Sequence, residues 1–314
     1  MKRYRDLNSY LRDMFGERVQ KIALDAGLGC PNRDGTISRK GCIFCNRRGS
    51  GTGALIHKGL SISEQIGQAR EFLYRRYGAR KFIAYFQSFT NTYAPVSRLK
   101  SLYDEALAQE GIIGLSVATR PDCVDREIMG LLSSYQGDNL LWLEYGLQSS
   151  HDRTLELINR GHDVAAFERG VMMAMEHSID VCAHVIMGLP GEDRDTMLQT
   201  ARYIGSLPVQ GVKIHLLYVT RGTALADLYH EKRFRCLDRR EYAALVVDFL
   251  ELLPPDMIIH RLTGDPVRSE LEAPLWAMEK QVNLKLIQTT LEERQTWQGK
   301  RYRRSTAGEQ EQAG

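Results

Sequence analysis

Short runs of apolar and β-branched residues alternate along the chain with longer segments whose apolar positions recur at helical spacing. We predict strands at Lys21–Ala26, Lys81–Phe86, Ile112–Ala118, Leu140–Tyr145, Ile179–Met187 and Val212–Val219. Helices are expected between them at Ser63–Tyr77, Val96–Gln109, Asp125–Ser134, Val164–His177 and Asp195–Ile204. A strand–helix unit repeated about every 30 residues is typical of a parallel sheet with crossover helices. Because the glycine-rich first loop of a dinucleotide-binding fold is missing, the sequence predicts an α/β fold with a partial (β/α)6 TIM-like barrel.

This pattern divides the chain into four parts. Residues 1–20 form an amphipathic lead-in, residues 21–225 the barrel core, and residues 226–297 a C-terminal extension packed on the barrel. In the extension we predict a helix at Arg239–Leu253, ended by Pro254-Pro255, and a short strand within Met257–Asp265. From residue 298 to residue 314 the chain is polar, and we expect a disordered tail.

The composition is that of an ordinary globular protein. The 314 residues include 42 Lys and Arg against 39 Asp and Glu, which gives a formal charge of +3, and 43% are hydrophobic. These values exclude a disordered chain. No uncharged apolar stretch approaches the roughly 20 residues of a membrane span, and no apolar run follows the charged N-terminus. We therefore expect a cytoplasmic protein without a membrane partner.

Three of the six cysteines, Cys30, Cys42 and Cys45, fall within one short segment. Their spacing is C-x11-C-x2-C, on a glycine-rich loop directly after the first predicted strand, where barrel enzymes place their chemistry. In a cytoplasmic chain of this size, such cysteines indicate reactive or metal-binding thiols rather than disulfides. Cys123, Cys182 and Cys236 are scattered singly and are expected to be small buried hydrophobic residues.

Three thiolates are one ligand short of a closed tetrahedral zinc site or of a cluster held by four cysteines. A structural zinc could recruit His57, twelve residues after Cys45, as its fourth ligand. Three inert buried thiols are a poorer interpretation, because a loop rich in Gly, Asn, Asp and Arg makes a poor core. We favour a 4Fe–4S cluster with one iron left open, since a catalytic centre needs an open coordination position.

Several separate motifs add to this interpretation. They are Cys-Pro-Asn-Arg-Asp-Gly-Thr at 30–36, Tyr-Phe-Gln-Ser at 85–88, Thr-Arg-Pro-Asp at 119–122, Gly-Leu-Gln-Ser at 146–149, Asn-Arg-Gly-His at 159–162 and Gly-Leu-Pro-Gly-Glu at 188–192. With them the chain resembles a radical S-adenosylmethionine (SAM) enzyme, specifically the YhcC-like family related to the elongator catalytic subunit. The resemblance implies that the three cysteines ligate three irons and that SAM chelates the fourth. Reduction of such a cluster cleaves SAM to methionine and a 5′-deoxyadenosyl radical.

Polar residues at the C-terminal ends of successive strands are the natural groups to orient SAM beside the cluster. The candidates of this kind are Gln87, Ser88, Thr119 and Glu144. A charged residue such as Glu144 is costly inside a strand unless it faces the barrel mouth. Where the superfamily usually has Gly-Gly-Glu after the second strand, this chain has Gln87-Ser88.

The resemblance itself implies further cofactor contacts. Phe44 resembles the aromatic residue that packs near the adenine, and Gln148 and Arg160 match residues that contact SAM in the coproporphyrinogen-oxidase-like branch. His184 matches a histidine of the elongator branch, although a lone strand histidine can equally be a hydrogen-bonded core residue. His215 and Tyr218 are similar candidates for substrate contacts.

The relation to elongator implies a tRNA substrate. We predict an enzyme that remodels the aminomethyl-type side chain of a wobble uridine, with an electron donor such as flavodoxin or ferredoxin. Of several basic clusters, Arg47-Arg48 adjoins the cysteine loop, and phosphate contacts made there would be salt-sensitive. The alternatives are the same radical chemistry on a small metabolite or tetrapyrrole, a non-catalytic zinc-bearing nucleic-acid adaptor, and a redox-sensing cluster protein.

Overall fold

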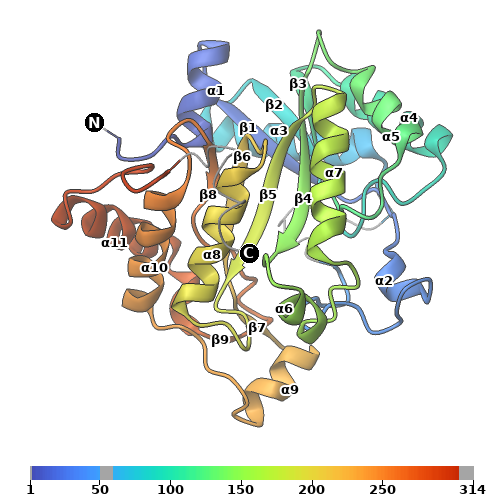
Figure 1. Ribbon diagram of the computed structural model, residues 1–314. Coiled ribbons are helices and arrows are strands. Elements are labelled where there is room, and N and C mark those ends of the chain that lie inside the picture. Colours follow the sequence, from blue (N-terminus) through green and yellow to red (C-terminus); the bar gives the residue numbers. More distant parts are fainter. Residues whose placement is uncertain (1, 50–58, 304–314) are drawn as a thin grey trace, which may run out of the picture.

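The computed structural model describes residues 2–49 and 59–303, and its main element is a curled sheet of seven parallel strands (Figure 1). The strands are β1 (Val19–Leu24), β2 (Lys81–Phe86), β3 (Ile112–Thr119), β4 (Leu140–Gln148), β5 (Asp180–Met187), β6 (Gly211–Leu216) and β8 (Ile258–Arg261). They lie side by side in this order, and every neighbouring pair is parallel. The sheet therefore forms a partial barrel whose edge strands are β1 and β8.

Helices follow the strands and cover the outer face of the sheet (Figure 1). The crossover helices are α3 (Ile62–Tyr77), α4 (Val96–Leu107), α5 (Arg126–Ser133), α7 (Val164–Glu176), α8 (Arg194–Ser206) and α10 (Arg239–Leu252). The remaining elements are α1 (Leu7–Phe15), α2 (Pro31–Asp34), α6 (Asp152–Leu157), α9 (Ala224–His230), α11 (Lys280–Glu293), the 3-10 helix Leu275–Met278, and the antiparallel pair β7 (Val219–Thr220) and β9 (Leu271–Ala273). Among the described residues, no helix combines the length and apolarity needed to cross a membrane.

Local signals fix where the first crossover helix begins and ends. The Ser61 hydroxyl accepts a hydrogen bond from the Glu64 backbone N–H at 3.2 Å, and the Glu64 carboxylate accepts one from the Ser61 N–H at 2.7 Å. This capping box satisfies two N–H groups that the first helical turn would otherwise leave open. Gly78, at φ 64°, ends the helix in the left-handed conformation.

The two faces of the sheet differ in chemistry. Residues of one parity, such as Leu115, Val117 and Leu143, are fully buried against the helices in one large apolar core. Residues of the other parity point into the barrel, and several of them are polar or charged. These inward residues are Lys21, Tyr85, Ser116, Glu144, His184, Lys213 and His260, one from each strand.

The predicted fold class is confirmed, and all six predicted strands are present. The predicted barrel had six strands, whereas the sheet has seven. The additional strand is β8, which was predicted within Met257–Asp265 and pairs with β6 in parallel. Residues of the predicted extension thus complete the sheet itself. Several boundaries also differ: β1 is Val19–Leu24 rather than Lys21–Ala26, β4 continues to Gln148, and β6 ends at Leu216 before β7 forms its own small sheet.

The chain after α11 is more ordered than the sequence predicts. Gln298 is only 3% exposed, and its side-chain amide donates to the carbonyl oxygens of Pro254 and Met257 at 2.6 and 2.8 Å. Its own carbonyl oxygen accepts the Arg5 N–H at 2.9 Å. Gln298, the first residue of the tail predicted to be disordered, is therefore held against the barrel by these amide hydrogen bonds. Residues 304–314 lie outside the described part.

Candidate active site at the cysteine loop

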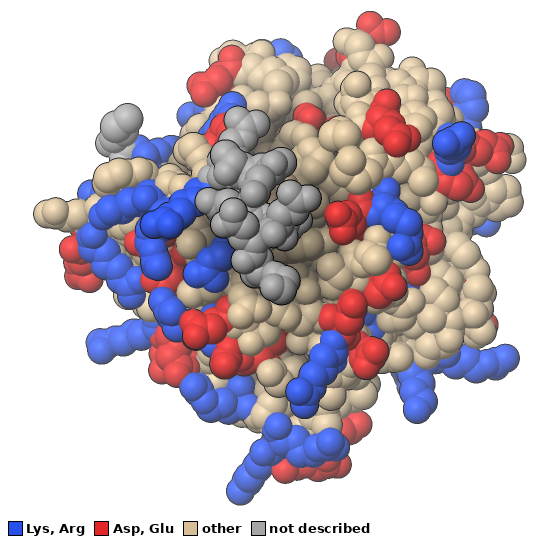
Figure 2. All heavy atoms as spheres, viewed as in Figure 1, with Lys and Arg blue, Asp and Glu red and all other residues tan. Residues whose placement is uncertain are grey.

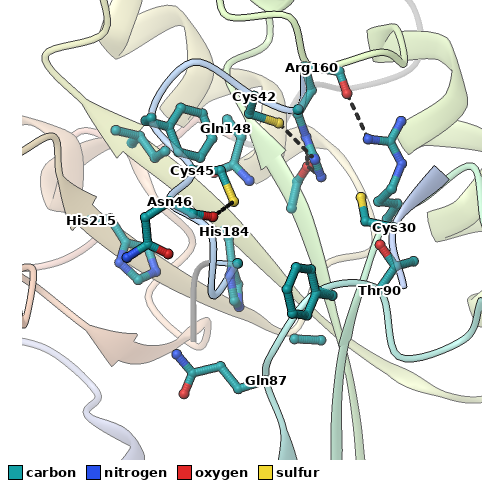
Figure 3. Close-up of a pocket in the computed structure, with 18 of the residues that line it drawn as sticks. Cys30, Cys42, Cys45, Asn46, Gln87, Thr90, Gln148, Arg160, His184 and His215 are labelled. Carbon is teal, nitrogen blue, oxygen red and sulfur yellow. Dashed lines mark hydrogen bonds between the residues drawn. The ribbon is translucent and has the colours of Figure 1, made fainter. Parts of the chain in front are cut away.

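The three clustered cysteines line a single cavity of about 170 Å³ at the carboxyl ends of the strands. Cys30 directly precedes the short helix α2, which has Pro31 at its first position. Gly35, at φ 103°, ends α2 in the left-handed region and lets the loop turn back, so that Cys42 and Cys45 follow on the same side. In Figure 3 the sulfur atoms of all three face a common space.

Hydrogen-bond donors point at two of the sulfur atoms. Arg33 Nη1 lies 3.2 Å from Cys45 Sγ, and Arg160 Nη1 and Asn32 Nδ2 lie 3.7 and 3.6 Å from Cys42 Sγ. Burial raises the pKa of Cys45 to about 12, so this thiol keeps its proton until a metal displaces it. Three thiols on one cavity with cationic N–H donors beside them fit an iron–sulfur cluster, whose sulfurs accept such hydrogen bonds.

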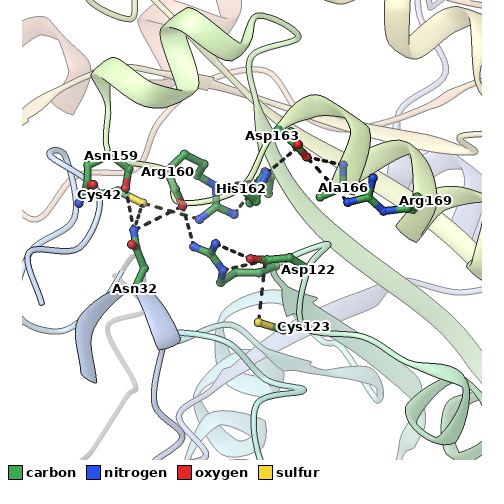
Figure 4. A network of polar contacts seen from close by, with 12 residues as sticks. Asn32, Cys42, Asp122, Cys123, Asn159, Arg160, His162, Asp163, Ala166 and Arg169 are labelled. Atoms are coloured by element: carbon green, nitrogen blue, oxygen red, sulfur yellow. Dashed lines mark hydrogen bonds and ion pairs between the residues drawn. The ribbon is translucent and has the colours of Figure 1, made fainter. Parts of the chain in front are cut away.

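A polar brace holds the cysteine loop against β4 and the segment that follows α6 (Figure 4). Arg160 donates through Nε and Nη2 to the Gly146 carbonyl at 3.1 and 2.7 Å. Asn32 Nδ2 donates to the Asn159 carbonyl at 2.7 Å, and Arg120 Nη1 donates to the Arg160 carbonyl at the same distance. Arg160, predicted as a SAM contact, therefore also positions the loop that carries Cys42.

Glycine is required at one point of this brace. Gly161 has φ 76°, and a Cβ there would lie 2.8 Å from Asn32 Oδ1. Any larger residue would push the Asn-Arg-Gly-His segment away from the cysteine loop. This gives a physical reason for the motif at 159–162.

Most of the predicted cofactor residues meet around the cavity. Its lining includes Phe44, Gln87, Thr119, Glu144, Gln148, Arg160, His184, His215 and Tyr218 together with the three cysteines. Gln148 reaches it because β4 bulges between Gly146 and Gln148, which has φ 77°. Ser88 does not line the cavity: it is 1% exposed, and its hydroxyl has no hydrogen-bond partner among the described residues. The structure thus places Ser88 behind the wall of the site.

Other lining residues were missed by sequence reasoning. Asn46, Tyr85, Thr90 and Arg261 contribute side chains to the cavity. Tyr85 belongs to a quoted motif, and its inward parity is the signal that could have revealed it. Arg261 lies on the seventh strand, so its position depends on a sheet pairing that the sequence did not predict. His57, the suggested zinc ligand, lies outside the described residues.

Below the cysteines, Glu144 lies at the centre of a buried group of ion pairs. We call Lys21, Tyr85, Glu144, His184 and Lys213 the lysine–glutamate cluster. Lys21 Nζ and His184 Nε2 lie 2.5 and 2.6 Å from the two Glu144 carboxylate oxygens, and Lys213 also pairs with this carboxylate. Lys213 donates to the Tyr85 hydroxyl at 2.9 Å. Glu144, predicted to contact SAM, faces the barrel interior as expected but is held by side chains of the protein.

Charge within this cluster is set by mutual pairing. Burial alone would raise the pKa of Glu144, but Lys21, Lys213 and His184 together hold it well below its usual value. Burial, followed by the nearby Lys213 charge, lowers the pKa of His184 to about 4. At neutral pH the cluster therefore contains a carboxylate and a neutral His184 that donates to it.

Comparisons with known proteins agree with this geometry. The Radical SAM superfamily matches residues 27–204, and the Radical_SAM C-terminal domain matches residues 209–293. The chain is 43% identical over 303 residues to the uncharacterized protein YtqA of Bacillus subtilis, which covers 96% of this chain and 94% of YtqA. It is 40% identical over 263 residues to protein YhcC of Escherichia coli, covering 83% of this chain and 84% of YhcC. The resemblance seen in the motifs is confirmed.

More distant similarities reach proteins that are longer than this chain. The tRNA uridine(34) acetyltransferase of Dehalococcoides mccartyi is 28% identical over 162 residues, which are 50% of this chain and 34% of that protein. Among solved structures, Elp3 of the archaeon Methanocaldococcus infernus matches with a TM-score of 0.67 at 15% identity, over 89% of this chain and 64% of that one. This last match shows a shared fold.

Proposed function

The chain belongs to the radical SAM superfamily, and we propose that it is an enzyme that cleaves SAM reductively with one 4Fe–4S cluster held by Cys30, Cys42 and Cys45. The observation that carries this proposal is that the three cysteines line one cavity at the carboxyl ends of the strands. When bound there, the reduced cluster supplies the electron that converts SAM to methionine and a 5′-deoxyadenosyl radical.

The side chains around the cavity are suited to bind and orient this cofactor. Phe44, next to Cys45 in the chain, offers an aromatic face for the adenine. Gln87 and Gln148 offer amide groups from the ends of two strands. Arg33 and Arg160 place cationic donors beside the sulfur atoms of Cys45 and Cys42, and hydrogen bonds of this kind tune a bound cluster.

Apolar residues complete the wall of the cavity. Ile186, Leu216 and Leu217 line the cavity next to His184 and His215. Such a wall excludes water and oxidisable groups from the reacting centre, which protects a reactive intermediate from side reactions.

The test is anaerobic reconstitution with iron and sulfide, followed by dithionite reduction in the presence of SAM and chromatography for 5′-deoxyadenosine. We expect a brown protein that releases this product. A colourless, zinc-loaded protein that releases none would overturn the enzyme assignment and favour the zinc-bearing adaptor.

For the substrate, we propose the side chain of a tRNA wobble uridine, with flavodoxin or ferredoxin as the electron donor. The support is similarity to a protein named tRNA uridine(34) acetyltransferase and the exposed pair Arg47-Arg48 immediately after the cysteine loop. Lys and Arg side chains are interspersed with Asp and Glu over the face shown in Figure 2. Contacts to RNA phosphates would therefore come from separate cations, and binding should weaken steeply as salt rises.

Two measurements test this substrate. The nucleosides of bulk tRNA from a deletion strain should contain an altered uridine, which the purified enzyme with SAM converts to the form found in the parent strain. Arg47→Gln should weaken tRNA binding at low salt, whereas Arg202→Gln, on the outer helix α8, should not. Identical nucleoside profiles together with SAM cleavage would point to a small metabolite instead.

A further inference from the structure

A second, wider cavity opens between the two edge strands of the partial barrel. Its volume is about 1130 Å³, and its walls include Val19 and Lys21 of β1 and Ile259 and Arg261 of β8. Tyr85, Gln87 and Arg261 line both this cavity and the one at the cysteine loop. A molecule that enters between β1 and β8 therefore meets the lysine–glutamate cluster before it reaches the cysteines.

Cations outnumber carboxylates where the two cavities meet. Lys21 and Lys213 share the single carboxylate of Glu144. Arg261 and Lys280 share that of Asp265, at 3.2 and 2.9 Å. Four cationic side chains thus pair with two acids.

Among the described residues, one further carboxylate on these walls, that of Asp25, lowers this excess from two cations to one. Asp6 pairs with Lys2 at 2.6 Å, and Asp25 accepts the Gly27 backbone N–H. Burial lowers the pKa of His184 to about 4 and that of His260 well below its usual value, so both rings are neutral at pH 7. Arg48 has its own partner in Glu270.

Separate cationic side chains lie beside the cysteine sulfur atoms. Arg33 lies beside Cys45 and Arg160 beside Cys42, as described above. The negative charge of a bound cluster would therefore be balanced by those two arginines rather than by Lys21 and Lys213. Lys213 is 7% exposed, and its ammonium group contacts Glu144 and the Tyr85 hydroxyl. An ammonium group has three N–H donors, so a third donor can serve a further acceptor.

We propose that Lys213 and Arg261 bind an oxyanion of the substrate, a carboxylate or a phosphate, at the junction of the two cavities. This proposal rests on the proposed function, because the rest of the substrate extends into the SAM-binding cavity. The bound oxyanion supplies the negative charge that these cations lack. It also holds the substrate so that the reacting atom lies at a fixed distance from the anionic group. The source is either an acidic group on the modified base or a phosphate of the RNA backbone.

The test measures anion binding by thermal unfolding, which needs neither SAM cleavage nor tRNA. Cluster-loaded protein with SAM bound, which occupies the open iron, is heated under argon with about 100 mM sodium acetate, sodium phosphate or, at matched ionic strength, sodium chloride. One of the two oxyanions should raise the Tm of the wild type by about 2–4 °C above the chloride value. Acetate alone identifies a carboxylate site, and phosphate alone a phosphate site.

The variants show whether the anion binds at the junction. Lys213→Met should remove the rise, and Lys213→Arg should retain it. Lys100→Met removes an exposed lysine that pairs with Asp104 on α4 and should behave as the wild type. If Lys213→Met does not fold, Arg261→Gln takes its place.

Two results would overturn the proposal: no rise with either oxyanion, or an equal rise in Lys213→Met or Arg261→Gln. The same preparations are assayed for 5′-deoxyadenosine. A protein that shows the rise but does not cleave SAM would leave the anion site standing and remove the proposed function, so the two failures are distinguishable.

Discussion

The cysteine loop and the lysine–glutamate cluster line the same cavity but satisfy their polar groups in different ways. Around the cysteines, Arg33, Asn32 and Arg160 direct N–H groups at the sulfur atoms of Cys45 and Cys42. In the cluster, Glu144 is 0% exposed, and cations from β1 and β6 are paired with it. The first region is arranged around a group that the chain must bind, whereas most of the second is satisfied internally.

This difference separates function from stability. Removing the Cys42 sulfur atom takes away a ligand, but the buried Arg160 guanidinium beside it keeps its two hydrogen bonds to the Gly146 carbonyl. Removing the Glu144 carboxylate leaves two buried ammonium groups without their partner, which costs far more free energy. Changes at the cysteines should therefore affect chemistry first, and changes in the cluster should affect folding first.

The largest effect is expected from Cys42→Ala. The variant should lose iron binding and all release of 5′-deoxyadenosine, since two cysteines do not retain the cluster. Its free energy of unfolding without iron should stay within about 1 kcal/mol of the wild type. Cys236→Ala, at a cysteine outside the cavity lining, is the matched control and should keep both iron and activity. Iron retained by Cys42→Ala at the wild-type level would contradict the ligand assignment.

Glu144→Ala should produce the largest loss of stability. Two buried lysines lose their carboxylate, and the expected cost is about 3–5 kcal/mol in the free energy of unfolding, measured by urea titration of the protein without iron. Glu71→Ala breaks an exposed pair with Arg75 and should cost less than about 1 kcal/mol. Similar losses in the two variants would mean that the cluster does not stabilise the barrel.

How far the sequence predicts each region follows from the same contrast. The cysteine loop was identified because its three cysteines lie within 16 consecutive residues. Their spacing can be recognised in the sequence without knowledge of the fold. The cluster joins residues 123 and 69 positions apart in the chain, so its pairing depends on strand order and register. Glu144 was correctly expected to face inward, but nothing in one strand shows which lysines meet it.

The features that the sequence did not predict, which are the pairing of β8 and the direction of Ser88, have the same origin. β8 is four residues long and follows a double proline, so its membership of the sheet depends on pairing with β6 and not on its own pattern. Ser88 was expected in the site because it follows β2, yet the chain turns it behind the wall while Gln87 faces the cavity. Strand boundaries place residues near a site, but side-chain direction at a strand end depends on the turn.

Acid should weaken the fold through buried histidines before it reaches Glu144. The pKa of His184 lies at about 4 and that of His162 at about 3, chiefly because of burial, whereas both titrate near 6.5 when unfolded. The unfolded chain therefore binds protons first, and stability falls as pH drops from about 6.5 towards 4. Each histidine contributes up to about 1.4 kcal/mol per pH unit in that window.

Urea titrations at several pH values between 7 and 5 measure this slope. His162→Gln should reduce it by about a quarter, since His184, His215 and His260, whose pKa values burial also lowers, still contribute. Glu144 stays ionised over this range because its pKa is lowered, and its contribution is lost only as pH falls through that lowered value. Parallel curves for wild type and His162→Gln would exclude His162 as a source of the acid sensitivity.

The smallest effect is expected from Arg160→Lys, and it tests whether the brace also serves the cofactor. Lysine keeps the charge near Cys42 but cannot donate twice to the Gly146 carbonyl, as Arg160 does at 3.1 and 2.7 Å. The cysteine loop and the bulge that presents Gln148 would then be held less firmly, so iron should be retained while SAM binds about tenfold more weakly. Equilibrium dialysis with labelled SAM measures this, and Arg169→Lys, on the exposed side of α7, is the matched control. Unchanged SAM affinity in Arg160→Lys would show that the brace positions the cysteine loop alone. If Arg160 also positions the cofactor, the loss of its paired guanidinium donors must weaken SAM binding.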